Sequence, residues 1–296
     1  MMEKAGAGSV KSLQELHKRT LEIIECERKK EEERLETGII YLPTWREDRY
    51  GSPNSFLRSA LFAAIQSKDR KYLEKAEVFS QQGISISYTG QQLNQEDMTV
   101  WLALVDLMKK NPLGMKCKFT AHEILKYMGL PTGGTQYEQL EMAVRRMTAC
   151  LVEVETERYI YGKSLIEGFV IDKDTNQYRV KLSRHLTQLF GDNDWTAIDW
   201  EQRKQLRNKP LCLKLHDYYS SHEKPFPISL GFLLDLTGSV NKQKADFKRK
   251  VKTALEELVR IGFLRSYSIE QNIVKVERNQ NSISKPKPLL NIDSTI

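Results

Sequence analysis

Several features are absent from this chain, and each absence excludes a class of protein. It has no run of 18 consecutive apolar residues, so we expect no membrane-spanning helix. Its N-terminus has no apolar signal segment, so we expect a cytoplasmic protein. No HxH, HExxH or P-loop sequence occurs, so we predict no metal site, no cofactor and no nucleotide hydrolysis. The few cysteines never form a CxxC pair, which favours scattered reduced thiols over structural zinc or a disulfide framework: Cys26, Cys117, Cys150 and Cys212.

An excess of positive charge is concentrated near the C-terminus. The 46 lysines and arginines outnumber the 39 acids and give a formal net charge of +7, with a pI near 9.0, which favours an anionic partner. From Lys242 to Lys252, six cations accompany one acid, a local net charge of +5. Apolar residues recur at helical spacing through the same segment, which predicts a packed helix with one strongly basic open face. These apolar residues are Phe247, Val251, Ala254, Leu255 and Leu258.

This basic helix closes the second of two segments that share one order of predicted elements. In each segment a helix, a short strand, a second helix, a turn, a third helix and a hairpin follow one another, which is the order of a winged-helix domain. A chain of 296 residues is long enough for about two domains. We therefore predict an α+β fold with two tandem winged-helix domains at 51–198 and 199–278, a flexible charged arm at 1–50 and a disordered tail at 279–296.

Local signals place the elements within these domains. Asn94, Thr120 and Ser229 stand where helix N-caps are expected, because each precedes an apolar-periodic segment. Alternating residues after position 151 predict a flap of two or three strands. Helices other than the basic one are expected at 94–110, 121–130, 135–151, 208–222 and 229–238, and the last hairpin is expected to turn at Gln271 and Asn272.

The third helix of a winged-helix domain is the one that enters the major groove of DNA. Arginine and lysine on such a helix read guanine edges, and the flanking cations hold phosphates. The alternative is a solvated helix face, in which charges normally alternate in sign. The cations here are crowded without compensation, which favours DNA. The predicted DNA-binding residues of the basic helix are Lys242, Lys244, Asp246, Lys248, Arg249, Lys250, Lys252 and Thr253.

The third helix of the first segment is less basic, so DNA contact there depends more on the repeated element order. Its predicted buried residues are Tyr137, Leu140, Val144, Met147 and Leu151. Its predicted DNA-binding residues are Thr135, Gln136, Glu138, Gln139, Arg145 and Arg146, beside Met142 on the same outward face. The predicted wing residues are Arg158, Lys163, Arg265 and Lys275, for each of which an ordinary surface charge is the alternative.

A catalytic function is the weaker interpretation. Tyr218 and Tyr219 lie between His216 and His222, which raises the alternative of a DNA-nicking enzyme with a tyrosine nucleophile. The two histidines are six residues apart and would point roughly 240° from each other on a helix, so they make a poor metal pair. We predict that these aromatic residues are structural and that the protein has no catalytic residues.

Four blocks of sequence resemble the TrfA family of plasmid replication initiators: "PNSFLRSALF", "ISYTGQQLNQEDMTVWLALVDLMKKNPLG", "LFGDNDWTAIDWEQRKQL" and "LHDYYSSHEKPFPISL". The resemblance implies two winged-helix domains that bind directly repeated iterons in origin DNA and open an adjacent AT-rich segment. It also implies recruitment of host DnaA, DnaB helicase and the sliding clamp, and a monomer active on DNA beside a dimer linked to copy control. A winged-helix transcription regulator would use the same residues and stays the alternative. "LTQLF" at 186–190 weakly resembles a clamp-binding peptide, for which an amphipathic helix end is the other explanation.

Overall fold

The computed structural model describes Lys18 and residues 40–81, 83–155, 160–191, 194–239 and 243–279. The chain divides into two compact units, Met1–Ile40 and Tyr41–Ile296. Both predicted winged-helix domains therefore fall within one unit. Most of the predicted arm and nearly all of the predicted tail lie outside the described residues.

The residues that follow Tyr41 are packed, so the predicted flexible arm is wrong for residues 41–50. Leu42 and Tyr50 are buried in the larger hydrophobic core, and the ring of Trp45 stacks on Phe190 at a centroid distance of 6.2 Å. Strand β1 (Arg49–Pro53) pairs antiparallel with β11 (Trp195–Asp199). The partners of this segment lie about 140 positions further along the chain, and for that reason a local pattern does not reveal them.

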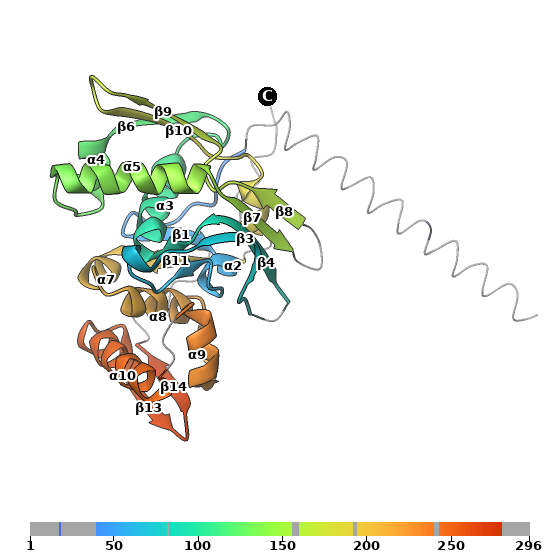
Figure 1. Ribbon diagram of the computed structural model, residues 1–296, viewed down its shortest axis with the longest axis vertical. Helices are drawn as coiled ribbons and strands as arrows, with labels where there is room; N and C mark the ends of the chain where they lie inside the picture. The colour runs from blue at the N-terminus through green and yellow to red at the C-terminus, as the bar shows by residue number, and fades with distance from the viewer. Residues whose placement is uncertain are drawn as a thin grey trace, which may run out of the picture. The chain divides into compact units, whose positions relative to one another are not determined.

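The first predicted set of elements is present in the expected order. Asn94 and Thr120 each form a capping box, which satisfies free N–H groups at the start of α3 and α4. The three strands of this segment form an antiparallel sheet of order β6-β10-β9 (Figure 1). The elements are α3 (Gln95–Met108), β6 (Lys116–Thr120), α4 (Ala121–Tyr127), α5 (Gly134–Thr148), β9 (Gly168–Asp172) and β10 (Gln177–Lys181).

The second set repeats this order, and its sheet has the corresponding order β12-β14-β13. Ser229 caps α9 by accepting a hydrogen bond from the N–H of Phe232. Gln271 and Asn272 both have positive φ angles, 48° and 66°, as a two-residue hairpin turn requires. The elements are α8 (Pro210–Ser220), β12 (Ile228–Ser229), α9 (Leu230–Leu236), α10 (Lys244–Arg260), β13 (Leu264–Glu270) and β14 (Ile273–Arg278).

The predicted flap after residue 151 is instead divided between two sheets. Strands β7 (Leu151–Glu155) and β8 (Ile160–Lys163) join β3 (Tyr72–Val78) and β4 (Ser85–Gln91) in a four-stranded sheet of order β3-β4-β7-β8. Strand β10 pairs with β6 on one side and with β9 on the other, so β9 and β10 alone form the hairpin of the first segment. The remaining elements are α2 (Asn54–Leu57), β2 (Phe62–Ala63), a 3-10 turn (Ser67–Asp69), β5 (Leu93–Asn94), α6 (Leu186–Leu189) and α7 (Trp200–Gln205).

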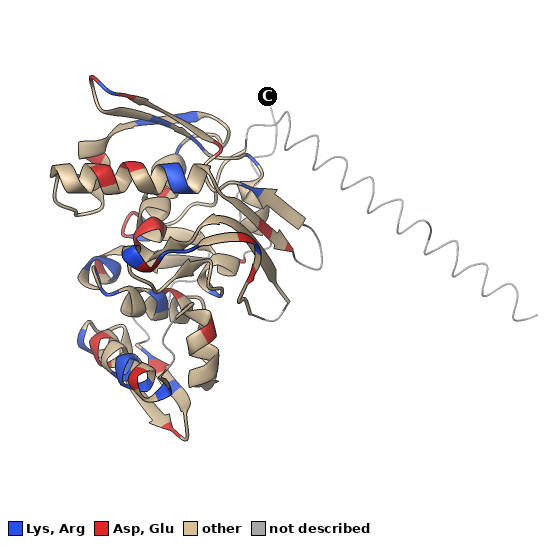
Figure 2. Cartoon of the chain, viewed as in Figure 1, with Lys and Arg blue, Asp and Glu red and all other residues tan. Residues whose placement is uncertain are grey.

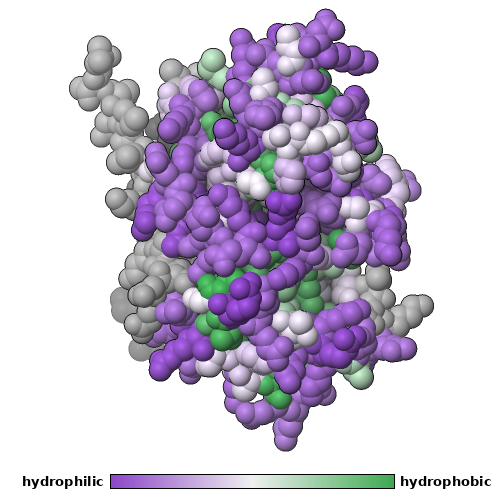
Figure 3. Space-filling view, turned by 90° about the vertical axis from the view of Figure 1, so that its left-hand side faces the viewer, coloured by the Kyte–Doolittle hydropathy of each residue, from purple (hydrophilic) through white to green (hydrophobic). Residues whose placement is uncertain are grey.

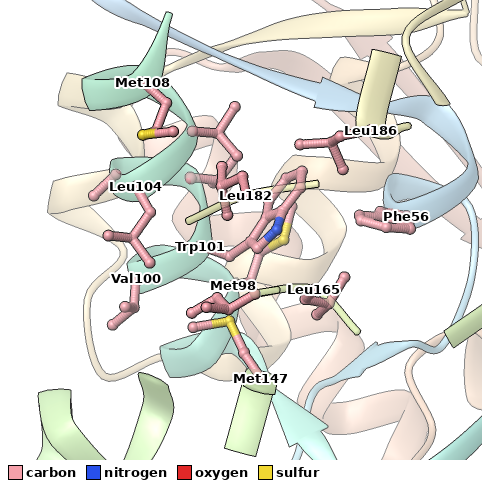
Figure 4. Close-up of a cluster of buried hydrophobic side chains, with 14 of the residues drawn as sticks. Phe56, Met98, Val100, Trp101, Leu104, Met108, Met147, Leu165, Leu182 and Leu186 are labelled. Atoms are coloured by element: carbon pink, nitrogen blue, oxygen red, sulfur yellow. The ribbon is translucent and has the colours of Figure 1, made fainter. Parts of the chain in front are cut away.

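The described residues form two hydrophobic cores, one from residues up to the start of α7 and the other from residues after α7. The larger one extends from Leu42 to Trp200 and is built around Trp101 of α3, which is packed among residues from several elements (Figure 4). The smaller one extends from Leu206 to Val276. The change from one core to the other falls between Trp200 and Leu206, close to the predicted boundary at 198.

The predicted packing of the two third helices is largely confirmed. All five apolar residues expected beneath the basic helix are buried. In α5, Leu140, Val144 and Met147 are buried and Tyr137 is half-buried. Leu151 is 41% exposed, because α5 ends at Thr148 and Leu151 begins strand β7.

Candidate nucleic-acid interface

The outward face of α10 carries the cations that the sequence predicts. Lys248 is exposed, the Arg249 side chain is 74% exposed, and Lys244, Lys250, Lys252 and Thr253 are exposed around them. Lys242 lies outside the described residues. Five cations of one helix therefore face solvent, on the side opposite the buried stripe that holds the helix in place.

The expectation that these cations are uncompensated is wrong. Asp246 accepts from Arg249 at 2.5 Å and lies 2.8 Å from Lys250, and Lys252 lies 3.9 Å from Glu256, so α10 carries both signs of charge (Figure 2). Residues three and four apart are neighbours on a helix, so these contacts form locally. Exposed pairs of this kind contribute only about 0.2–1 kcal/mol, so an approaching phosphate can replace the carboxylate at little cost.

The outward face of α5 is confirmed for most of its predicted residues. Thr135, Glu138 and Gln139 are exposed, and Gln136 is half-buried. Arg145 is exposed, forms a 2.6 Å ion pair with Glu141 and lies over the ring of Phe169. This face is polar and has no excess of cations, in contrast to the basic face of α10.

Arg146 does not point outward, and its prediction as a residue of the outward face is wrong. Its guanidinium binds the carboxylate of Asp97, with the closest contact at 2.7 Å. Asp97 is fully buried; it also accepts from Arg70 at 2.6 Å and from the backbone N–H of Asn94 at 3.0 Å. One buried carboxylate therefore caps α3 and ties the first turn of α3 to the C-terminal part of α5.

A second buried ion pair joins the two cores. Arg203 of α7 donates to Asp217 of α8, and each side chain is only 1% exposed. A second nitrogen of Arg203 donates to the side-chain oxygens of Gln95 at 3.1 Å and Thr99 at 3.3 Å, both on α3. Burial raises the pKa of Asp217, but the charges and hydrogen bonds of Arg203 and His216 together outweigh burial, and the net shift is downward.

A buried lysine of α8 binds the backbone of the larger core. Lys214 is 1% exposed, and its ammonium donates to the carbonyls of Leu57, at 3.2 Å, and Ser59. These carbonyls lie at and just beyond the end of α2, where helical carbonyls lack partners. Burial lowers the pKa of Lys214 to about 8.

A family model and a curated relative both match this chain, and both carry the same family name. The family model of the TrfA protein matches residues 4–278. This chain belongs to the TrfA family. A curated relative, the plasmid replication initiator protein TrfA of Escherichia coli, is 26% identical over 252 residues. The match covers 82% of this chain and 65% of the relative, so the chain spans less than two thirds of that protein's length.

One solved structure gives the fold of this TrfA-family chain further support. A crystal structure of domains 2 and 3 of RctB matches 77% of this chain and 98% of that chain, with a TM-score of 0.52 and 15% sequence identity. A second structure of the same two domains has a TM-score of 0.46 and 13% identity and covers 74% of this chain and 96% of that one. The first match shows that the mixed helix and strand fold described above is shared with those domains.

The predicted wing residues of this TrfA-family chain lie in different places. Arg265 on β13 and Lys275 on β14 are exposed on the second hairpin, as expected. Lys163 lies on β8 of the four-stranded sheet, opposite Val152, so it is not part of the first hairpin as predicted. Arg158 lies outside the described residues. The turn of the hairpin β9–β10 instead presents Lys173, which could have been found by aligning the hairpins of the two segments.

Three of the four residues of the nicking alternative are buried, and the fourth, His222, is half-buried. Tyr219 is fully buried and Tyr218 is 4% exposed. Burial raises the pKa of both hydroxyls, that of Tyr218 to about 12. His216 is fully buried, and burial lowers its pKa. Because neither hydroxyl faces solvent, these tyrosines are not placed to attack a DNA phosphate.

Three further observations concern expectations from the sequence. Leu186, Leu189 and Phe190 of "LTQLF" are buried in the larger core, so this segment is not displayed as a clamp-binding peptide. Within the described residues, no cluster of three or more His, Cys, Asp and Glu side chains is arranged to hold a metal ion. No helix in the described part of the chain has the length and apolar character needed to cross a membrane.

Proposed function

We propose that this chain is a plasmid replication initiator that binds iterons, the directly repeated sequences of a replication origin, without catalysis. Each set of helix, strand, helix, helix and hairpin is a winged-helix domain, and the two domains dock on successive major-groove faces of one repeat. The observation that carries the proposal is the outward face of α10, where five exposed cations are held by a buried apolar stripe. Membership of the TrfA family supports the same function.

The partners and the assembly follow from the family. Bound to its repeats, the protein opens an adjacent AT-rich segment and recruits host DnaA, DnaB helicase and the sliding clamp. It binds DNA as a monomer, and a homodimer contributes to copy control. Because "LTQLF" is buried, any contact with the clamp is made by another part of the chain.

Arg249→Ala tests the contact between α10 and the bases. Arg249 lies in the N-terminal half of the third helix, the part that contacts base edges in this class of domain. If it reads a guanine, we expect the substitution to cost about 1–3 kcal/mol on the cognate repeat and to relax specificity at that base pair. The measurement is fluorescence anisotropy on cognate and random duplexes.

Arg260→Ala is the matched control for this test. Arg260 is an exposed arginine of the same helix, and it also pairs with a carboxylate three residues earlier, Glu257 at 2.6 Å. It lies at the C-terminal end of α10, so we expect little change in the specificity for the repeat. An equal loss on cognate and random duplexes for Arg249→Ala would show that Arg249 holds a phosphate and does not read a base.

An origin-replacement assay separates initiation from transcriptional regulation. The gene for this chain and the repeat region of its plasmid are joined to a selectable marker as the only source of replication. We expect stable transformants, and none when the repeats are deleted. If the protein binds the repeats and yields no transformants, it is a regulator that uses the same DNA-binding surface.

A further inference from the structure

A short segment that connects the two cores borders the cavities beside both third helices. Lys204, Arg207 and Asn208 line a cavity of about 530 Å³ together with Thr135 and Gln139 of α5. The next residue, Lys209, lines a cavity of about 870 Å³ together with Arg249 and Thr253 of α10. In Figure 1, α7 lies between α5 and α10. The segment 204–209 therefore separates the two surfaces that we propose to read DNA.

The cations of this segment contact two different parts of the protein, the connection between α4 and α5 and the helix α10. Arg207 is exposed and donates to the carbonyl of Gly129 at 3.0 Å, in the connection between α4 and α5. Lys204 packs over the same glycine, where an added Cβ would lie 3.4 Å from its Cδ atom. Lys209 lies 2.6 Å from Glu257 of α10. Arg207 and Lys204 thus contact the connection that leads into α5, and Lys209 contacts α10.

The backbone of the segment is fixed before any ligand arrives. Leu206 is fully buried, and the buried pair of Arg203 and Asp217 holds α7 against α8. Asn208 has a φ of 61°, which turns the chain from α7 into α8. Hydrophilic residues cover most of the face shown in Figure 3, and hydrophobic residues gather in one area below its middle. Arg207 and Lys209 are exposed, and Lys204 is half-buried beside Glu201 at 2.7 Å. Three cations on a fixed backbone match an anionic partner rather than an apolar one.

Two helices in successive major grooves leave one segment of duplex between them. In that segment the sugar-phosphate strands and the minor groove face the protein, and contacts to phosphates position a protein without reading sequence. We propose that Lys204, Arg207 and Lys209 bind the DNA phosphates between the two major-groove contacts, which sets the spacing of the two helices along the repeat. This inference rests on the proposed function and adds a third contact surface to it.

The salt dependence of binding tests this surface. The double variant Arg207→Ala, Lys209→Ala removes two cations that are exposed at the surface. Each lost phosphate contact should reduce the slope of log Kd against log salt by about 0.9, so we expect a reduction of about 1.8. The affinities for cognate and random duplexes should fall in parallel. Arg207→Lys with Lys209→Arg keeps both charges and should keep the slope.

Lys224→Ala is the control, because Lys224 is an exposed lysine that lines neither cavity. Circular dichroism and the melting temperature verify that each variant is folded. If the double variant has the slope of Lys224→Ala while the wild-type protein prefers the repeats, this inference is wrong and the proposed function stands. If the wild-type protein shows no preference for the repeats over random duplex, the proposed function itself fails.

Uncharged phosphates locate the contact on the DNA. Methylphosphonates are placed in the repeat between the two major-groove faces that footprinting protects. We expect them to weaken binding of the wild-type protein and to have a much smaller effect on the double variant. Equal losses for the two proteins would overturn the assignment of Arg207 and Lys209 to that stretch of backbone.

Discussion

Raising monovalent salt from about 50 to 200 mM is expected to weaken binding of this protein to its repeats by about 10³–10⁵-fold, if roughly six to ten phosphates are contacted. The loss arises because each neutralised phosphate releases condensed counterions, and that release is less favourable at higher salt. The N-terminal half of α10, the part expected to enter the groove, exposes five cations. Five contacts alone would give a slope of about −4.5 and a loss of only ~500-fold over the same range. The predicted loss therefore requires cations beyond that half of the helix.

A titration of a fluorescent duplex at several salt concentrations and constant pH measures this slope. The same titration on random duplex should give a similar slope with lower affinity, because phosphate contacts carry no sequence information. A flat salt dependence would contradict a duplex-binding function for the basic face. A slope near that of five contacts would confine DNA binding to α10 and leave α5 and the segment 204–209 without a contact.

Asp97→Ala is expected to destabilise the protein by about 3–5 kcal/mol, because it leaves buried cations without their carboxylate. The Arg70 side chain is 4% exposed and that of Arg146 is 13% exposed, and both bind Asp97. The substitution also removes the capping-box contact to the N–H of Asn94. The free energy of unfolding, measured in urea, should therefore fall by a large part of the total stability of an ordinary domain.

Glu96→Ala is the matched control for Asp97→Ala. Glu96 is the preceding carboxylate of the same helix turn, but its side chain is 59% exposed and lies 3.9 Å from Arg70. Its loss should cost less than about 1 kcal/mol, as for other exposed pairs. Asp97→Asn keeps the shape and one acceptor oxygen, so we expect an intermediate effect. A cost for Asp97→Ala no larger than that for Glu96→Ala would show that the two arginines find other partners or water.

The elements that depend on neighbouring residues could be predicted from the sequence. Asn94, Thr120 and Ser229 cap their helices as expected, because a cap interacts with the two or three residues that follow it. The buried stripe of α10 was also correct, because helical periodicity alone determines it. Pairings between distant segments were not predicted. The sheet that unites β4 with β7 joins residues 62 to 70 positions apart, and the alternation of its strands is equally consistent with a single flap.

In the candidate site, too, contacts between near neighbours were visible in the sequence and contacts between distant residues were not. The pairing of Arg249 and Lys250 with Asp246 could have been predicted from their spacing of three and four residues. It was missed because the net charge of a segment does not show which charges are paired. Arg146 looked outward because its partner Asp97 lies 49 positions earlier in the chain. The cations at 204–209 were missed because they lie on no predicted third helix or wing, although four of the seven residues from Arg203 to Lys209 are basic. Their position follows only from the packing of α7.

The first turn of α3 has a consequence for recombination between relatives of this protein. Gln95 in that turn binds Arg203, and Arg203 binds Asp217 in the second half of the chain. A chimera that joins this first half to the second half of another family member after α7 would bring a foreign side chain opposite Arg203. Unless that side chain is a carboxylate, the arginine is left as an isolated interior charge. Exchange of intact halves is therefore restricted to parents that share this acid, however similar their third helices are.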